Sequence, residues 1–147
     1  MFENYVVKEH LTDRMIEAGD EVTRRLVESG GPVDAVFWWW DPEFHDDWQF
    51  VVSASSHVLH APGDSYDWIF SAIDALDEKA KAEVINVFLP MGSERELVRA
   101  IRSAYPTGGK IVRMRLKKHF PNGKFIPDAL LYWATSVVQG VAVSYNL

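Results

Sequence analysis

The segment from Lys110 to Phe120 alternates apolar and basic residues, and Asn122-Gly123 follows it directly. Because successive side chains of a strand point to opposite faces, this alternation predicts a half-buried strand. One face would carry Val112, Met114 and Leu116, and the other Arg113, Arg115 and Lys117. Asn-Gly is the favoured pair for a tight hairpin, so the chain from Phe125 onward is expected to return antiparallel. The fold must therefore contain an antiparallel sheet.

Helical and strand patterns alternate through the rest of the chain. Apolar residues at three- and four-residue spacing predict a first helix over residues 12–29. A second helix is expected after Pro62-Gly63, with Asp64 or Ser65 as its cap, and a third from Ser93, where Glu96 completes a capping box. Strands are predicted at residues 33–40, 48–53 and 84–89, and one or two more after Phe125, turning at Gln139-Gly140.

This order of elements predicts a single α+β domain over residues 1–147. The expected order is α-β-β-α-β-α-β-β-β, with about three helices and a mixed, mostly antiparallel sheet of about five or six strands. We expect the helices and the sheet to form a single pair of layers. A chain of 147 residues can bury a sufficient core without disulfides or structural metals.

The charge of the chain is divided along its length. Residues 1–94 contain six Lys/Arg and nineteen Asp/Glu, whereas residues 95–147 contain nine and two, giving −13 and +7 for a total of −6. The basic residues of the second part share faces of the predicted third helix and of the alternating strand. They could bind an acidic protein partner or nucleic acid through Arg95, Arg99, Arg102, Arg113, Arg115, Lys117, Lys118 and Lys124.

Two other interpretations of the basic residues remain open. They could pair with the acidic residues of the first part within one molecule, which would leave no free surface. They could also pair between two copies of the chain in a homodimer, because opposite patches on one subunit favour self-association. The overall charge of −6 argues against a dedicated nucleic-acid binder.

The acidic segment 41–47 is the alternative candidate site. With Asp41, Asp46 and Asp47, and with His57 or His60 further along, it could hold Mg²⁺ or Mn²⁺ and activate water, as in a divalent-metal-dependent nuclease or phosphodiesterase. The spacing matches no defined metal loop, which favours a solvated turn. Val51 also occupies the position at which a nuclease core of this kind would carry its lysine. We therefore expect no metal or other cofactor.

Trp38, Trp39 and Trp40 form an unusual aromatic run. In a strand, Trp38 and Trp40 share one face and Trp39 takes the other. Burial in the core is the favoured interpretation for residues of this size, and a stacking or dimer interface is the alternative.

The compartment is expected to be the cytoplasm. The chain has no cysteine, and its first residues do not resemble a secretory signal. Residues 129–147 lack charge over about the length of a membrane span. Their polar residues and their Val, Tyr and Trp content favour buried strands, and no membrane association is expected.

Several segments also resemble a known group of proteins. They are Ala35–Trp38, Trp48–Ser55, the residues Gly63, Tyr66 and Ile69, and the stretch from Arg113 through Asn122-Gly123 to Asp128 and Tyr132. Over residues 33–133, the chain is similar to small uncharacterised bacterial proteins with a tryptophan-rich hairpin near the N-terminus. The resemblance implies no activity and no site. The residues themselves predict a non-catalytic binding domain, with a metal-dependent nuclease and a structural homodimer as alternatives.

Overall fold

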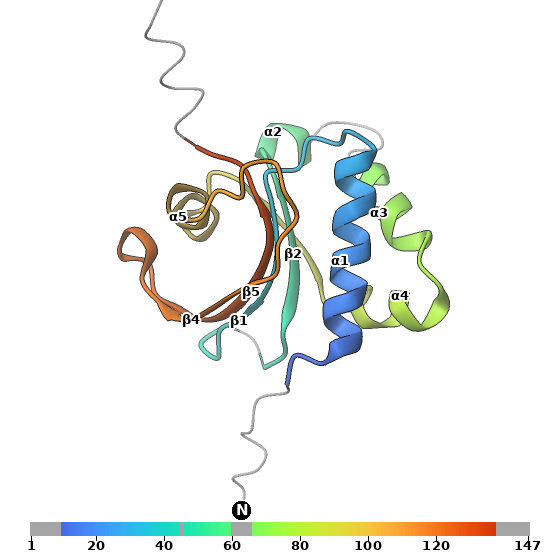
Figure 1. Cartoon of the computed structure of the whole chain (residues 1–147), viewed down its shortest axis with the longest axis horizontal. Coiled ribbons are helices and arrows are strands. Elements are labelled where there is room, and N and C mark those ends of the chain that lie inside the picture. Colours follow the sequence, from blue (N-terminus) through green and yellow to red (C-terminus); the bar gives the residue numbers. More distant parts are fainter. Residues whose placement is uncertain (1–9, 45, 60–65, 138–147) are drawn as a thin grey trace, which may run out of the picture.

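The computed structural model describes residues 10–44, 46–59 and 66–137 (Figure 1). Its helices are α1 (Asp13–Glu28), α2 (Ser56–Leu59), α3 (Asp67–Asp74), α4 (Glu78–Val84) and α5 (Glu96–Ala104). Its strands are β1 (Ala35–Trp40), β2 (Gln49–Ala54), β3 (Phe88–Gly92), β4 (Met114–His119) and β5 (Ile126–Ala134), and the turn η2 (Pro121–Gly123) joins the last two.

The strands form one mixed sheet in the order β3-β2-β1-β5-β4. Only β2 and β3 run parallel, and the other three neighbouring pairs are antiparallel. The α+β class and the mostly antiparallel sheet are thus confirmed. The hairpin after β4 is confirmed as well, because Asn122 and Gly123 both take positive φ angles, 49° and 78°, as a type I′ turn requires.

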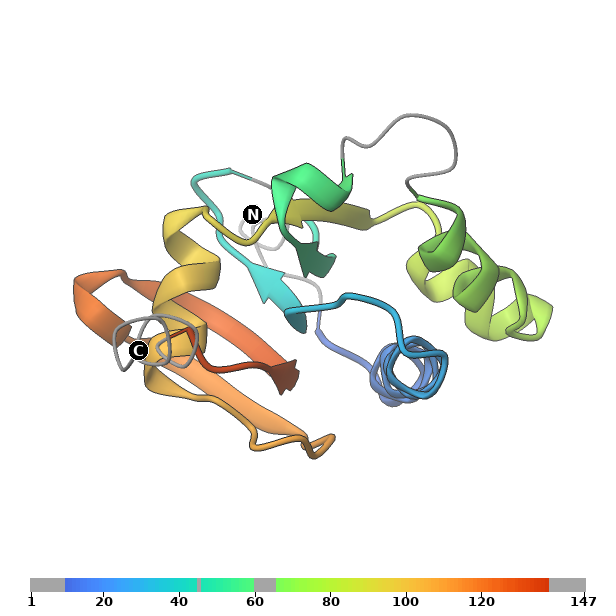
Figure 2. The same ribbon diagram turned by 90° about the horizontal axis from the view of Figure 1, so that it is seen from above.

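Helices cover both faces of the sheet, so the expected single pair of layers is wrong (Figures 1 and 2). α5 packs on one face, through Leu97, Val98 and Ile101. α1 packs on the other face beside α3 and α4, whose buried residues join the same core. A sheet buried on both faces needs apolar residues at successive strand positions, and β1 provides them with its run Ala35–Trp39.

α1 approaches the sheet closely at Gly19. A Cβ atom at this position would lie 2.5 Å from the Tyr132 hydroxyl and 2.7 Å from Trp38 Nε1. Both rings are fully buried, and their polar atoms bind α1 directly. Trp38 Nε1 donates to the Met15 carbonyl at 3.2 Å, and the Tyr132 hydroxyl donates to the Ile16 carbonyl at 2.6 Å. Glycine therefore allows the helix backbone to approach two polar aromatic side chains.

The helix predicted at residues 12–29 agrees with α1, and Thr12 caps it by accepting from Met15 N at 3.2 Å. The middle of the chain differs from expectation. α2 and α4 are additional helices, and α4 ends at Val84, where a strand was expected to begin. Asp77 nucleates α4 as an N-cap, accepting from Ala80 N at 2.9 Å. The third strand accordingly starts later, at Phe88.

The predicted capping box at Ser93 is also wrong. Arg95 is the N-cap residue of α5, and the Ser93 side chain does not cap the helix. Its hydroxyl donates to Asp34 Oδ2 at 2.6 Å and lies 3.0 Å from Ser53 Oγ. A buried hydroxyl beside a carboxylate gains a charge-assisted hydrogen bond, which outcompetes a cap.

Some predictions concern residues that the structure does not describe. They are the cap at Asp64 or Ser65 and the final turn at Gln139-Gly140. Within the described ranges, no helix is long and apolar enough to cross a bilayer.

Candidate functional site

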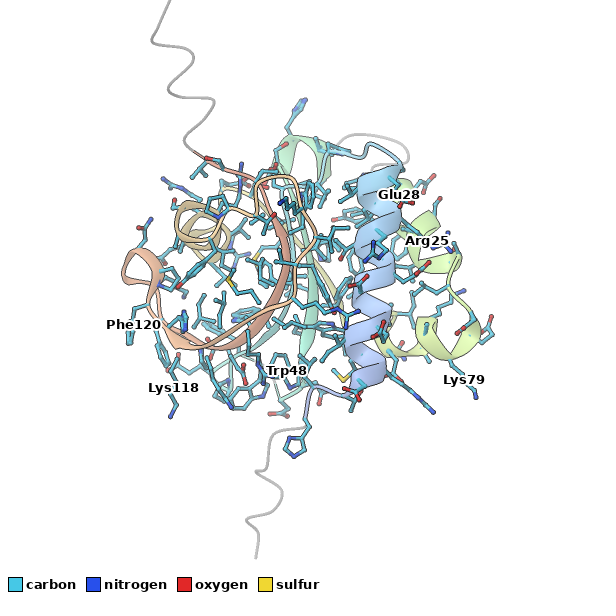
Figure 3. All side chains as sticks on the ribbon, viewed as in Figure 1. Arg25, Glu28, Trp48, Lys79, Lys118 and Phe120 are labelled. Atoms are coloured by element: carbon cyan, nitrogen blue, oxygen red, sulfur yellow. The ribbon has the colours of Figure 1, made fainter. Side chains whose placement is uncertain are left out.

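A groove of about 620 Å³ lies between the β1–β2 loop and the β4–β5 hairpin. We call it the lysine groove and define it by its lining residues, Trp40, Asp41, Pro42, Glu43, Phe44, Lys117, Lys118, Lys124, Phe125, Pro127 and Asp128. Strand pairing brings these distant segments together, because Asp128 of β5 lies opposite Trp40 on one side and Lys117 on the other. In Figure 3, Lys118 and Phe120 lie on the side of the molecule opposite Lys79.

The basic wall of the groove consists of Lys117, Lys118 and Lys124. Consecutive residues of a regular strand point to opposite faces, yet Lys117 and Lys118 both line the groove. Lys118 has a left-handed φ angle of 55°, which interrupts the alternation of β4. Among the described residues, no carboxylate forms an ion pair with any of the three lysines. Their charges are therefore available to a partner.

Two exposed phenylalanines, Phe44 and Phe125, line the same groove, and a third, Phe120, packs against Phe125. The described residues include four exposed large apolar side chains, and Phe44, Phe120 and Phe125 are three of them. Phe120 and Phe125 stack with their ring centroids 4.8 Å apart, and Phe44 contacts Trp39 at 6.1 Å. Apolar side chains clustered at one exposed site are typical of an interaction surface.

The remaining wall and floor of the groove carry carboxylates. Asp41 is 6% exposed, and its Oδ1 accepts from Glu43 N at 3.0 Å. Asp128 is 1% exposed and accepts two hydrogen bonds from Arg115, at 2.6 and 2.8 Å. This hydrogen-bonded pairing raises the pKa of Arg115. The guanidinium also lies 5.5 Å from the centre of the Trp48 ring. Arg115 is thus bound within the fold.

Two other arginines of the predicted basic surface are also engaged internally. Arg113 binds the Glu17 carboxylate at 3.0 and 3.1 Å and Asp20 Oδ2 at 3.0 Å, both on α1. These hydrogen bonds raise the pKa of Arg113. Arg102 donates to the Thr135 carbonyl at 3.1 Å and lies 3.7 Å from Asp34 Oδ2. For these residues the structure shows the internal pairing that the sequence left as an alternative.

Arg95 and Arg99 are exposed on α5 and do not line the lysine groove. Arg99 lies beside Asn122 in a separate hollow of about 150 Å³, which also includes Glu96, Ala100 and Ser103. The eight predicted basic residues therefore do not form one surface. The structure gathers three of them in the groove, places two on α5 and pairs three internally.

The residues proposed for a metal site are not brought together. Asp46 and Asp47 are exposed in the β1–β2 loop, and Asp41 is buried beside it. His57 lies in α2, which follows β2 at the opposite end of the sheet (Figure 1). A strand of that length spans roughly 20 Å, which is too far for one metal ion. His60 lies outside the described residues, and among those described no group of three His, Asp or Glu could hold a metal ion.

The tryptophan run is mainly part of the core. Trp38 is fully buried against α1, and Trp39 is 6% exposed on the α5 side, so the predicted alternation is confirmed. These two residues are unavailable as an interface, because both faces of the sheet are covered by helices. Trp40 is half-buried and lines the lysine groove.

Sequence reasoning missed the aromatic part of the groove. Phe44 and Phe125 are separated by about eighty positions, and no local pattern connects them. Their proximity follows from the pairing of β1 with β5. No protein-family model, curated protein or solved structure matches this chain significantly. The resemblance to small bacterial proteins with a tryptophan-rich hairpin therefore stays a prediction.

Proposed function

We propose that the chain is a non-catalytic binding domain that engages an acidic macromolecule through the lysine groove. One observation carries this proposal: three lysines without an ion pair in the described structure line one groove together with two exposed phenylalanines. Unpaired cations attract an acidic partner from solution, and apolar contacts stabilise the complex once it forms.

The internal ion pairs of three arginines exclude these residues from the proposed binding surface. Arg102, Arg113 and Arg115 would have to leave carboxylates of the same fold before they could bind a partner. Removing Arg115 from Asp128 would break two charge-assisted hydrogen bonds to a buried carboxylate, which is costly. The partner is therefore expected to contact the lysines rather than these arginines.

Fluorescence anisotropy with labelled polyglutamate and labelled single-stranded DNA tests the proposal. The wild-type chain is expected to bind at least one probe at low salt, and more weakly as salt increases. The variant Lys117→Glu, Lys118→Glu, Lys124→Glu should lose about tenfold or more in affinity, since three exposed ion pairs become repulsive contacts.

A matched control separates this site from the overall charge. Arg14→Glu, Lys79→Glu, Lys110→Glu makes the same charge change at three exposed positions outside the groove. It should retain most of the affinity. An equal loss in both variants, or no binding of either probe by the wild-type chain, would refute the proposed function.

A further inference from the structure

The size and lining of the lysine groove suit the insertion of a partner's apolar side chain rather than the binding of an extended polyanion. Its volume of about 620 Å³ lies within the range of small-ligand pockets, roughly 300–1,000 Å³. Aromatic and proline side chains line it on both sides, with Phe44 and Pro42 from the β1–β2 loop and Phe125 and Pro127 from the hairpin. A large apolar side chain that enters between them would remove apolar surface from water on both sides.

The charges of the groove are asymmetric. Lys117, Lys118 and Lys124 form one wall, whereas Asp41 and Glu43 belong to the other. Both loop carboxylates lie within the groove lining, so an extended polyanion would meet repulsion there as well as attraction. A ligand with a few localised negative charges can place them on the lysine wall and present neutral or donor groups to Glu43.

Nucleic acid satisfies this arrangement poorly. A strand of nucleic acid carries one phosphate at every nucleotide, so its charge continues beyond the three lysines that line the groove. Arginine is the side chain best suited to bind phosphate with two hydrogen bonds. Arg115 is instead held by Asp128, which lines the groove, and Arg113 is held by Glu17 and Asp20.

From these observations we infer that the lysine groove binds an acidic segment of a protein partner that inserts an aromatic or branched aliphatic side chain between Phe44 and Phe125. This inference rests on the proposed function and specifies its partner class. The neighbouring carboxylates of the segment contact Lys117, Lys118 and Lys124. Charge complementarity on one wall and apolar burial in the middle of the groove are both required for affinity.

Two labelled peptides test the inference directly. In the first, one phenylalanine is flanked on both sides by aspartates, and in the second, alanine replaces the phenylalanine. The wild-type chain is expected to bind the phenylalanine peptide about tenfold more tightly than the alanine peptide. Phe125→Ala should remove most of this preference while retaining the salt dependence. Phe125 is 42% exposed, so its truncation is not expected to unfold the chain.

The location is checked by the amide and indole spectrum of the ¹⁵N-labelled chain. The phenylalanine peptide should shift the Trp40 indole signal, whereas Trp68, on α3, should not move. Met114→Ala serves as a matched control, because Met114 is the fourth of the exposed large apolar side chains in the described residues and does not line the groove. It should bind both peptides as the wild type does.

The possible results separate the two proposals. Equal binding of both peptides, or a Phe125→Ala variant that keeps the preference, overturns the inference but leaves the proposed function intact. If the wild-type chain binds single-stranded DNA more tightly than the phenylalanine peptide, and the triple lysine variant loses this binding, the inference is overturned and the proposed function stands. Nucleic acid is then assigned as the partner. Failure of the wild-type chain to bind peptides, polyglutamate or DNA refutes both proposals.

Discussion

Replacing Gly19 by alanine should destabilise the fold, although the change improves helix propensity. In an exposed helix interior, Gly→Ala stabilises by about 1 kcal/mol. At Gly19 the new methyl group would lie 2.5 Å from the Tyr132 hydroxyl and 2.7 Å from Trp38 Nε1. Both side chains are fully buried and bound to α1, so they have no free space into which to move.

The expected magnitude combines three contributions. Overpacking of a buried site costs about 1–3 kcal/mol. Displacing α1 also weakens the hydrogen bonds from Trp38 and Tyr132 to its carbonyls, each worth about 0.5–1.5 kcal/mol. After the gain in helix propensity, we expect a net loss of about 2–4 kcal/mol in the free energy of unfolding.

Urea unfolding followed by tryptophan fluorescence measures this loss. Glu28→Ala, at the exposed last residue of α1, is the control and should change stability by less than about 0.5 kcal/mol. Tyr132→Phe removes the atom nearest to the new methyl group. In a double-mutant cycle, Gly19→Ala should therefore cost less when Tyr132→Phe is present. A Gly19→Ala variant as stable as the wild type, or strictly additive effects, would refute the packing argument.

Two further predictions concern buried polar groups. Burial raises the pKa of Tyr132, so the stability that its neutral hydroxyl contributes is present below about pH 10 and is lost as the pH rises further. Urea midpoints measured across this range should fall more steeply for the wild type than for Tyr132→Phe, and parallel slopes would contradict the assignment. Arg115→Met should cost about 2–3 kcal/mol because it removes two charge-assisted hydrogen bonds from the buried Asp128 carboxylate. Adding Asp128→Asn to Arg115→Met should recover part of that loss by thermal or urea unfolding, and a further loss would show that the carboxylate has other essential partners.

The sequence predicts those parts of the fold that depend on local periodicity. Residues 12–29 have helical spacing and a Thr cap, and α1 forms there with Thr12 as its N-cap. The Asn122-Gly123 pair produces the predicted turn because both residues tolerate positive φ angles. Ser93 shows the limit of such signals. Its local pattern matches a capping box, but the carboxylate of Asp34, which lies 59 positions earlier in the sequence, accepts a hydrogen bond from its hydroxyl instead.

The candidate site was predictable only in part for the same reason. The basic character of residues 95–124 is visible in the sequence, and three of the predicted residues line the lysine groove. The sequence does not reveal that Arg113 faces Asp20, 93 positions earlier, or that Arg115 faces Asp128 across a hairpin. Which cations remain available depends on strand register and helix placement, and both are tertiary properties.

β1 pairs with one strand that follows it directly in the sequence and with another that is synthesised much later. β1 spans residues 35–40, and one of its two neighbours is β5, at residues 126–134. A ribosome that adds about 5–20 residues per second therefore needs several seconds between completing β1 and delivering its second partner. During that interval the edge of β1 that pairs with β5 in the native sheet is unpaired, and the strand's side chains are apolar. A chaperone that binds extended apolar segments would be expected to meet this nascent chain at Ala35–Trp40.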